Sequence, residues 1–172
     1  MKRFVALLRA VNVGGTGKLA MADLRALCEE AGLRRVQTYI QSGNVVFDSA
    51  LEEPSLILEL EDRLRPLLGD KVGLLIRSAE QMAAIQAGNP FADSDPKHVY
   101  ALFLSAAPPP NALDLAKGRT DEALTLGARE IYIRYPSGQG RSKLRLPEMR
   151  QGTMRNMNTV AKLAEMARGG GG

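Results

Sequence analysis

The first 78 residues alternate between strand-like and helix-like hydrophobic patterns, and this order constrains the fold more than any other feature of the chain. Residues 4–11, FVALLRAV, form an apolar run with β-branched members, which is typical of a central strand. Apolar side chains then recur at helical spacing over residues 21–31, and Gly32 follows as a stop. Residues 36–40 and 45–49 predict a hairpin, residues 55–68 a second helix and residues 72–78 a fourth strand.

This order, βαββαβ, is the split arrangement called ferredoxin-like, in which an antiparallel sheet carries both helices on one face. The second half is less regular: we expect a helix over 79–88, a strand over 99–105, a short helix over 111–117, a hairpin over 122–136 and a closing helix over 157–168. The sequence therefore predicts an α+β fold with two parts, 1–78 and 79–168. The glycine tail, 169–172, is expected to be disordered.

Composition limits the classes of site that the chain can hold. It has 172 residues with one cysteine and one histidine, so an internal disulfide is excluded, and we expect neither a metal site nor a tightly held cofactor. Cys28 lies on the apolar side of the helix over 21–31, where a thiol behaves as a small hydrophobic group. No apolar run approaches the roughly 20 residues of a membrane span. Because Arg9 interrupts the short apolar start, we interpret it as the first strand of a cytoplasmic protein.

Positive charge is concentrated at the two ends of the sequence. The net charge is only +4, but residues 1–48 carry seven basic and four acidic side chains, and residues 137–172 carry seven and two. If folding brings these ends together, they would favour an anionic partner. Surface charge that merely keeps the protein dissolved is the alternative.

The loop at 12–19, NVGGTGKL, resembles a phosphate-binding loop but fails the GxxxxGK[ST] pattern at both ends, with Asn12 and Leu19. A weaker hypothesis survives, because a glycine-rich turn before a helix exposes backbone N–H groups to anions. On this interpretation Gly14, Gly15 and Lys18 contact the ligand. Alternatively, the two glycines only supply positive φ angles for a tight turn.

Residues 38–47, TYIQSGNVVF, place four polar residues inside the predicted hairpin, where two would make a turn. Gln41, Ser42 and Asn44 are all uncharged hydrogen-bonding groups. Either this cluster satisfies its own backbone, as Ser and Asn often do in turns, or it faces a ligand. Tyr39 precedes it and could stack on such a ligand.

Two stretches near the C-terminus add basic and polar groups. Residues 137–144, SGQGRSKL, offer Arg141, Ser142 and Lys143 beside two glycines, which suits either a phosphate or carboxylate cradle or a solvated turn. Residues 153–163 are expected to open the last helix, with more capping residues than one helix needs. Arg155 near the first turn of that helix would oppose the helix dipole, which favours an anion there. Asn156 and Asn158 would then be ligand contacts.

These motifs also carry a family resemblance. ALLRAVNVGG, KLAMADLR, TYIQSGNVVF, NPF, GQGRSKL and RNMNTVAKL occur in order along the chain, and together they resemble a bacterial family known as domain of unknown function 1697. The resemblance implies an α+β fold with a ferredoxin-like N-terminal part, and no activity. Such proteins usually have Trp where this chain has Met157. If that ring stacks on a ligand, Tyr39 could replace it here; otherwise Met157 fills a gap in the core.

Three functions remain open. The first is a binding protein with a positive, polar cleft between the two halves, whose ligand is an anionic small molecule such as a nucleotide, or single-stranded nucleic acid on an open sheet face. The second is a cofactor-independent group-transfer enzyme, and the third is a structural or self-association protein whose polar motifs are internal networks. The predicted ligand contacts are Arg9, Asn12, Gly14, Gly15, Lys18, Tyr39, Gln41, Ser42, Asn44, Arg141, Ser142, Lys143, Arg155, Asn156 and Asn158.

Overall fold

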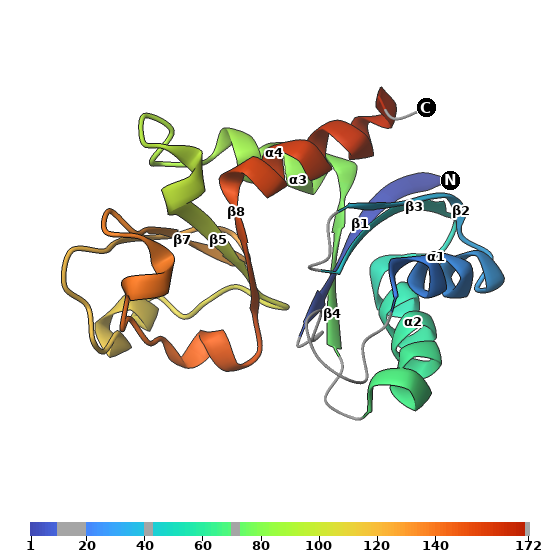
Figure 1. The fold of residues 1–172 in the computed structure, drawn as a ribbon, viewed down its shortest axis with the longest axis horizontal. Helices are drawn as coiled ribbons and strands as arrows, with labels where there is room; N and C mark the ends of the chain where they lie inside the picture. The colour runs from blue at the N-terminus through green and yellow to red at the C-terminus, as the bar shows by residue number, and fades with distance from the viewer. Residues whose placement is uncertain (10–19, 40–42, 70–72, 171–172) are drawn as a thin grey trace. The chain divides into compact units, whose positions relative to one another are not determined.

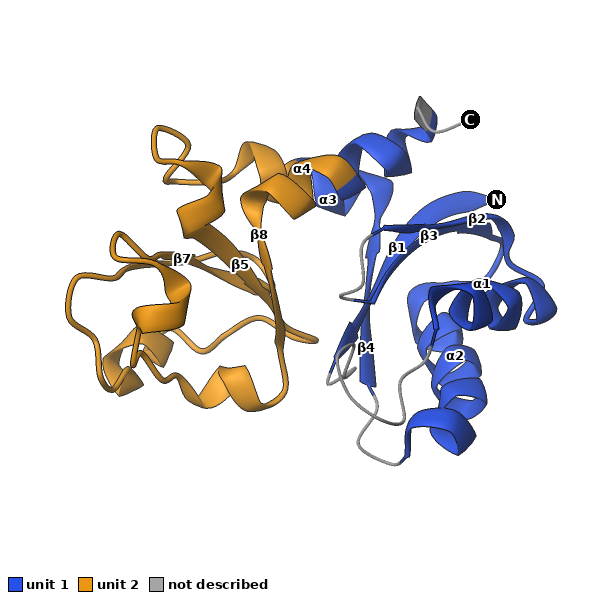
Figure 2. Cartoon of the chain, in the orientation of Figure 1, with its two compact units in different colours: residues 1–83, 163–172 blue, residues 84–162 orange. Residues whose placement is uncertain are grey.

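A computed structural model describes residues 1–9, 20–39, 43–69 and 73–170 of the chain. The chain divides into two compact units, which are coloured separately in Figure 2. Unit 1 contains residues 1–83 and 163–172, and unit 2 contains residues 84–162. The last ten residues therefore belong with the N-terminal unit. The domain boundaries expected from the sequence, 1–78 and 79–168, stay a prediction, because a compact unit is not by that fact a domain that folds alone.

Unit 1 has the predicted ferredoxin-like order. Its elements are β1 (Lys2–Arg9), α1 (Met21–Glu30), β2 (Arg34–Tyr39), β3 (Asn44–Ser49), α2 (Glu53–Leu68) and β4 (Gly73–Ser78). The strands form one antiparallel sheet in the order β2-β3-β1-β4, and both helices lie on the same face of it (Figure 1). The predicted hairpin and both predicted helices are confirmed, with boundaries shifted by no more than two residues.

The two faces of this sheet follow from the alternation of side chains along each strand. Phe4, Ala6 and Leu8 of β1 point to the helices, where they pack with leucines of α2 that recur every four residues, Leu56, Leu60 and Leu64. Cys28 is buried in the same core, as predicted, and burial raises the pKa of its thiol to about 12. The opposite face is also buried at Val5 and Leu7. The sheet therefore has no open apolar face at these positions.

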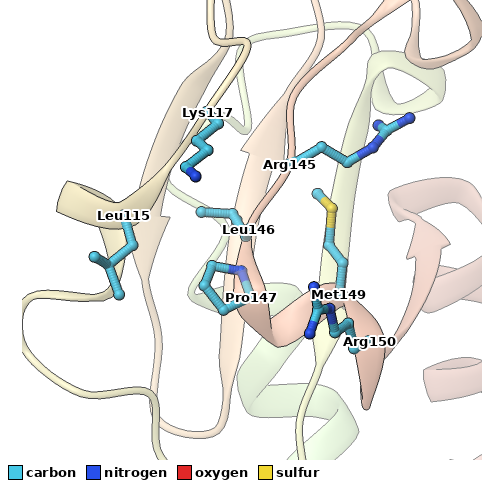
Figure 3. Close-up of a pocket in the computed structure, with 7 residues that line it drawn as sticks. All are labelled: Leu115, Lys117, Arg145, Leu146, Pro147, Met149 and Arg150. Carbon is cyan, nitrogen blue, oxygen red and sulfur yellow. The ribbon is translucent and has the colours of Figure 1, made fainter.

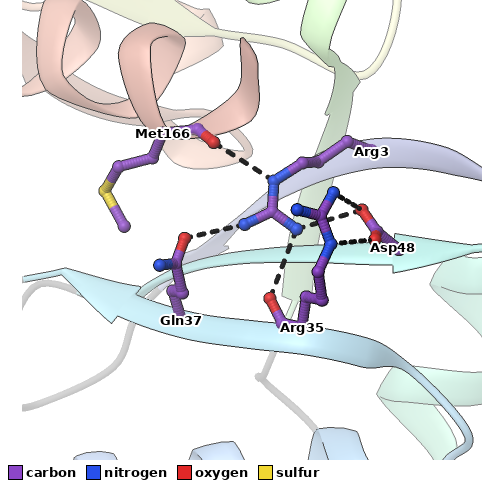
Figure 4. Close-up of polar contacts among 5 residues, drawn as sticks. All are labelled: Arg3, Arg35, Gln37, Asp48 and Met166. Atoms are coloured by element: carbon purple, nitrogen blue, oxygen red, sulfur yellow. Dashed lines mark hydrogen bonds and ion pairs between the residues drawn. The ribbon is translucent and has the colours of Figure 1, made fainter. Parts of the chain in front are cut away.

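The C-terminal segment contacts the face of the unit 1 sheet that the helices leave uncovered. Residues Met166–Gly170 form η5, a π-helical turn that contacts β1 and β3. Arg3 of β1 holds it there: its Nε donates to the carbonyl oxygen of Met166 at 3.1 Å (Figure 4). The same guanidinium donates to Asp48, Gln37 and the carbonyl of Arg35 at 3.0, 2.7 and 3.2 Å. Gly169 and Gly170 of the tail belong to η5, and the last two glycines lie outside the described residues.

Unit 2 is built on a second antiparallel sheet, with strand order β6-β7-β5-β8. Its strands are β5 (Val99–Phe103), β6 (Ala123–Leu126), β7 (Glu130–Arg134) and β8 (Thr153–Asn156), and α3 (Ala79–Ala87) and α4 (Met157–Glu165) begin or end within the unit. Short 3-10 turns occupy η1 (Pro96–His98), η2 (Ala112–Leu115), η3 (Gln139–Arg141) and η4 (Pro147–Arg150). The sequence therefore predicted the second α/β part and its hairpin, β6–β7, but not β8.

One hydrophobic core of unit 2 lies on one face of this sheet and contains Leu102 of β5 and Ile131 and Ile133 of β7. Leu144, Leu146 and Met149 pack against these strands from the long segment that leads to β8. On the other face, Tyr132 of β7 donates its hydroxyl to the carbonyl oxygen of Ile85 in α3 at 2.7 Å. The segment from residue 112 to 117 and the segment from 144 to 150 thus form the outer layer over one face of the sheet.

Candidate functional site

Six of the predicted ligand contacts lie outside the described residues: Asn12, Gly14, Gly15, Lys18, Gln41 and Ser42. Of the hairpin motif, Gly43 has a φ of +83°, which is the left-handed conformation expected of a turn glycine. The other nine predicted residues divide between the two units. Their convergence on one cleft therefore stays a prediction.

In unit 1, strand register brings Arg9, Tyr39 and Asn44 to the same face of the sheet. Asn44 stands directly opposite Leu7 of β1 and Tyr39 of β2, and residues directly opposite in a sheet share a face. Arg9 follows Leu7 by two positions, so it points the same way. This is the face that turns away from α1 and α2.

Asn44 is completely buried, and its Nδ2 donates to the carbonyl oxygen of Tyr39 at 3.0 Å. This bond joins the last residue of β2 to the first residue of β3. Arg9 lies across the backbone of β4, because a β-carbon at Gly73 would stand 2.7 Å from its Nη2. The local structure thus gives both side chains a role inside the protein.

The loop before residue 144 is held by a buried carboxylate. Ser142 donates its hydroxyl to Glu122, and Thr120 donates its backbone N–H to the same side chain at 2.6 Å. Both bonds lower the pKa of Glu122, and the bond from Ser142 has the larger effect. Arg141 and Ser142 line a cavity of about 30 Å³ with two acidic side chains, which is room for about one water molecule and not for a phosphate. Lys143 is exposed.

Arg155 lies two residues before the start of α4, near its first turn as expected, but it is part of a strand that the sequence did not predict. It belongs to β8, where it pairs with Ala101 of β5, and its Nη1 donates to Oγ1 of Thr153 at 2.6 Å and to the carbonyl of Met154 at 2.9 Å. Burial lowers the pKa of its guanidinium to about 10, so it stays charged at neutral pH. The capping-type residues of this stretch favoured a helix start, but pairing with β5 extends them into a strand.

The last helix begins only after β8. Oδ1 of Asn156 accepts from the backbone N–H of Thr159 at 2.9 Å, which is an N-cap bond. Asn158 is exposed in the first turn. Met157 is buried, which agrees with a core position for the residue that differs from the usual Trp. Asn156 therefore serves as the N-cap of α4.

A pocket that the sequence did not predict lies in unit 2 (Figure 3). It has a volume of about 490 Å³, within the range of small-molecule sites. Four lining residues are apolar and three are basic, and the described lining contains no carboxylate: Leu115, Lys117, Arg145, Leu146, Pro147, Met149 and Arg150. Figure 3 shows Lys117 and Arg150 on opposite sides of Leu146 and Pro147, with Leu115 facing that pair.

A two-residue bridge positions the basic side chains. Lys117 and Arg145 exchange both backbone hydrogen bonds, at 2.9 and 2.8 Å, so their side chains leave the bridge on the same face. Gly118 allows this approach, since it has a φ of +69° and a β-carbon there would collide with the carbonyl oxygen of Lys143. Two like charges directly opposite each other repel. Their charged ends point apart in Figure 3, and Nη1 of Arg145 bonds to the carbonyl of Leu144 at 2.9 Å.

Part of this pocket was visible in the sequence. Residues 145–150, RLPEMR, place two arginines around three apolar residues and Glu148, in the most basic segment of the chain. Lys117 stands far from them in sequence, and no local pattern predicts an isolated bridge. Across the described parts of the chain, no group of three or more His, Cys, Asp or Glu side chains could hold a metal ion. No helix in those parts is long and apolar enough to cross a bilayer.

Comparison with known proteins places the chain in a family. The family model described as "Protein of unknown function (DUF1697)" matches residues 1–132. The chain belongs to the DUF1697 family. This confirms the resemblance seen in the ordered motifs. The matched region includes Lys117 and ends before Arg145 and Arg150.

A solved structure is similar over nearly the whole chain. It is described as that of conserved bacterial protein SP0830 from Streptococcus pneumoniae, with 27% sequence identity and a TM-score of 0.79. The match covers 96% of this chain and 98% of that one. The two proteins therefore share their fold over nearly the whole of both chains.

Proposed function

We propose that this DUF1697 protein binds an anionic ligand, bearing a phosphate or carboxylate, in the pocket of unit 2. The observation that carries the proposal is the composition of the lining: Lys117, Arg145 and Arg150 surround an apolar surface, and the described lining has no acidic side chain. Lys117 and Arg145 leave their backbone bridge on the same face, so both add positive charge beside the pocket, which attracts an anion. Lys and Arg are also the side chains that bind phosphate and carboxylate through charged hydrogen bonds.

The pocket favours binding over group transfer. Its described lining contains no histidine, hydroxyl or carboxylate, so it offers no acid–base pair and no hydroxyl nucleophile. It also contains no aromatic ring on which a base could stack, which argues for a small anion rather than single-stranded nucleic acid.

A structural role for the polar motifs is supported by separate observations. Asn44, Ser142 and Asn156 each make a hydrogen bond that holds a turn, a loop or a helix start. Such bonds suit internal networks that keep a fold unique. We therefore assign these three to the scaffold and the anion to the basic pocket.

The test is to titrate the whole protein with acetate and with inorganic phosphate while following backbone amide signals by NMR. We expect the signals of residues around Lys117, Arg145 and Arg150 to shift with saturation. Lys117→Ala should weaken binding about fivefold, in proportion to an exposed charged contact of about 1 kcal/mol. Lys143→Ala is the matched control, since Lys143 is an exposed lysine two residues before Arg145 but is not in the described lining.

Two results would contradict the proposal. One is an absence of saturable shifts around the pocket with either anion. The other is an equal loss of affinity in Lys117→Ala and Lys143→Ala, which would mean that the anion follows general surface charge. A single-stranded oligonucleotide that binds more tightly than phosphate, with its shifts elsewhere, would likewise move the function away from this pocket.

A further inference from the structure

We infer that the ligand of this pocket is an amphipathic acid, with a hydrocarbon body of several carbons joined to a carboxylate or phosphate head. This inference rests on the proposed anion-binding function and specifies the class of ligand. It follows from the apolar part of the lining, which a small inorganic anion would leave unused.

The space is much larger than an inorganic anion needs. A volume of about 490 Å³ corresponds to about 16 water molecules at about 30 Å³ each. Acetate or phosphate displaces only a few of these. A ligand that fills the pocket must therefore present additional atoms to Leu115, Leu146, Pro147 and Met149.

The apolar residues are arranged to contact such a body. Leu115 is 49% exposed at the end of η2, whereas Leu146 is buried in the unit 2 core, so the pocket wall runs from the solvent edge into the core layer. Met149 packs against that core and also lines the pocket, and its flexible thioether can adapt to ligands of different shape. Covering Leu115 and Met149 with hydrocarbon removes their apolar surface from water, which is the favourable term.

The basic residues suit the same ligand. Lys117 and Arg150 lie on opposite sides of Leu146 and Pro147 in Figure 3. Both residues are exposed, and long basic side chains of this kind cover apolar surface with their methylene stems while their charged ends stay in water, where an acidic head would remain partly hydrated. A neutral hydrocarbon would contact only the apolar residues of the lining, and an inorganic anion would contact only the basic ones.

Isothermal titration of the whole protein with acetate, butanoate, hexanoate and octanoate tests the inference, with inorganic phosphate and 1-octanol for comparison. All ligands are used below the concentration at which they aggregate. We expect one saturable site and an affinity that rises about fourfold for each methylene until the pocket is full. Octanoate should bind more tightly than 1-octanol, because only the acid reaches the cations.

Paired leucine variants locate the effect. Leu115→Ser should reduce the gain in affinity from each added methylene, because Leu115 lines the apolar part of the pocket. Leu58→Ser is the control, since Leu58 is also exposed, at 67%, but lies on α2 in the other unit. Circular dichroism spectra should match the wild type for both variants, because both positions face solvent.

The two proposals fail in different ways. Phosphate binding that depends on Lys117, with no change in affinity from acetate to octanoate, would overturn the amphipathic ligand and leave anion binding standing. Equal affinity for octanoate and 1-octanol, unaffected by Lys117→Ala, would overturn anion binding and leave only an apolar pocket. Leu58→Ser with the same effect as Leu115→Ser would also overturn the inference, because the hydrocarbon would then be binding elsewhere.

Discussion

Replacing Arg3 with methionine should release the C-terminal segment from the unit 1 sheet. Arg3→Met keeps most of the methylene stem but removes the guanidinium that donates to the Met166 carbonyl, Asp48, Gln37 and the Arg35 carbonyl (Figure 4). The Arg3 side chain is only 7% exposed, so water does not readily replace these bonds. The loss therefore combines a partly buried ion pair with the anchor of η5.

The magnitude follows from what remains after the substitution. Removing one partner of a buried ion pair costs about 3–5 kcal/mol, because the other charge is left without a partner. Here Asp48 keeps its bonds to Arg35, so we expect the lower end, about 3 kcal/mol. For a chain of this length about 1 kcal/mol corresponds to about 2–4 °C in Tm, so Arg3→Met should lower Tm by about 6–12 °C.

Arg35→Met is the matched control. Arg35 contacts the same carboxylate, at 2.5 and 3.2 Å, but its side chain is 53% exposed, and Figure 4 shows its guanidinium bonded to Asp48 and not to Met166. Its removal should therefore destabilise the protein less. Urea denaturation of both variants measures the cost, and hydrogen exchange of a peptide covering 163–170 should speed up in Arg3→Met alone.

The reasoning fails if the two variants lose equal stability, because burial would then not distinguish the two arginines. It also fails if exchange in 163–170 is unchanged in Arg3→Met, since Arg3 would then not hold the segment.

Three further predictions concern single side chains. The bond from Arg35, followed by the interactions with Arg3, lowers the pKa of Asp48 in the folded protein. The Asp48 carboxylate therefore stabilises the fold above its unfolded pKa of about 3.9, and this stabilisation is lost as the pH falls below that value. The stability difference between wild type and Asp48→Asn, measured by urea denaturation, should shrink from pH 6 towards pH 3. Cys28, buried with a pKa of about 12, should not react with a thiol reagent at pH 8 until the protein unfolds; rapid labelling of the native protein would contradict its burial. Asn44→Ala should cost about 1–3 kcal/mol in unfolding free energy without changing acetate affinity, because Asn44 closes a hairpin from a buried position; weaker acetate binding at unchanged stability would instead make it a ligand contact.

Local pattern was sufficient for most of the secondary structure. The apolar run of β1 and the leucine repeat of α2 predicted their elements, because a strand or helix buried on one side must repeat its apolar residues at the period of its backbone. The order of these elements then predicted the ferredoxin-like sheet of unit 1. The same reasoning predicted that Cys28 is buried.

β8 shows where local pattern was insufficient. Thr153 and Asn156 are good capping residues, and they suggested that the helix begins here. In the structure only Asn156 caps, and residues 153–156 pair with β5, which lies about fifty residues earlier. Backbone bonds to a distant strand therefore placed residues 153–156, with buried Arg155 among them, in a strand that local pattern did not predict.

For unit 1 the sequence alone determined the elements, their order and the buried side of each helix, since these depend on neighbours a few residues away. Tertiary structure decided the pairing of Lys117 with Arg145 and the bond from Arg3 to Met166, which are separated by 28 and 163 residues. Such contacts depend on how whole strands and loops are brought together, and nothing in the local sequence encodes the partner. The basic pocket arises from contacts of this second kind, so only the folded chain shows it.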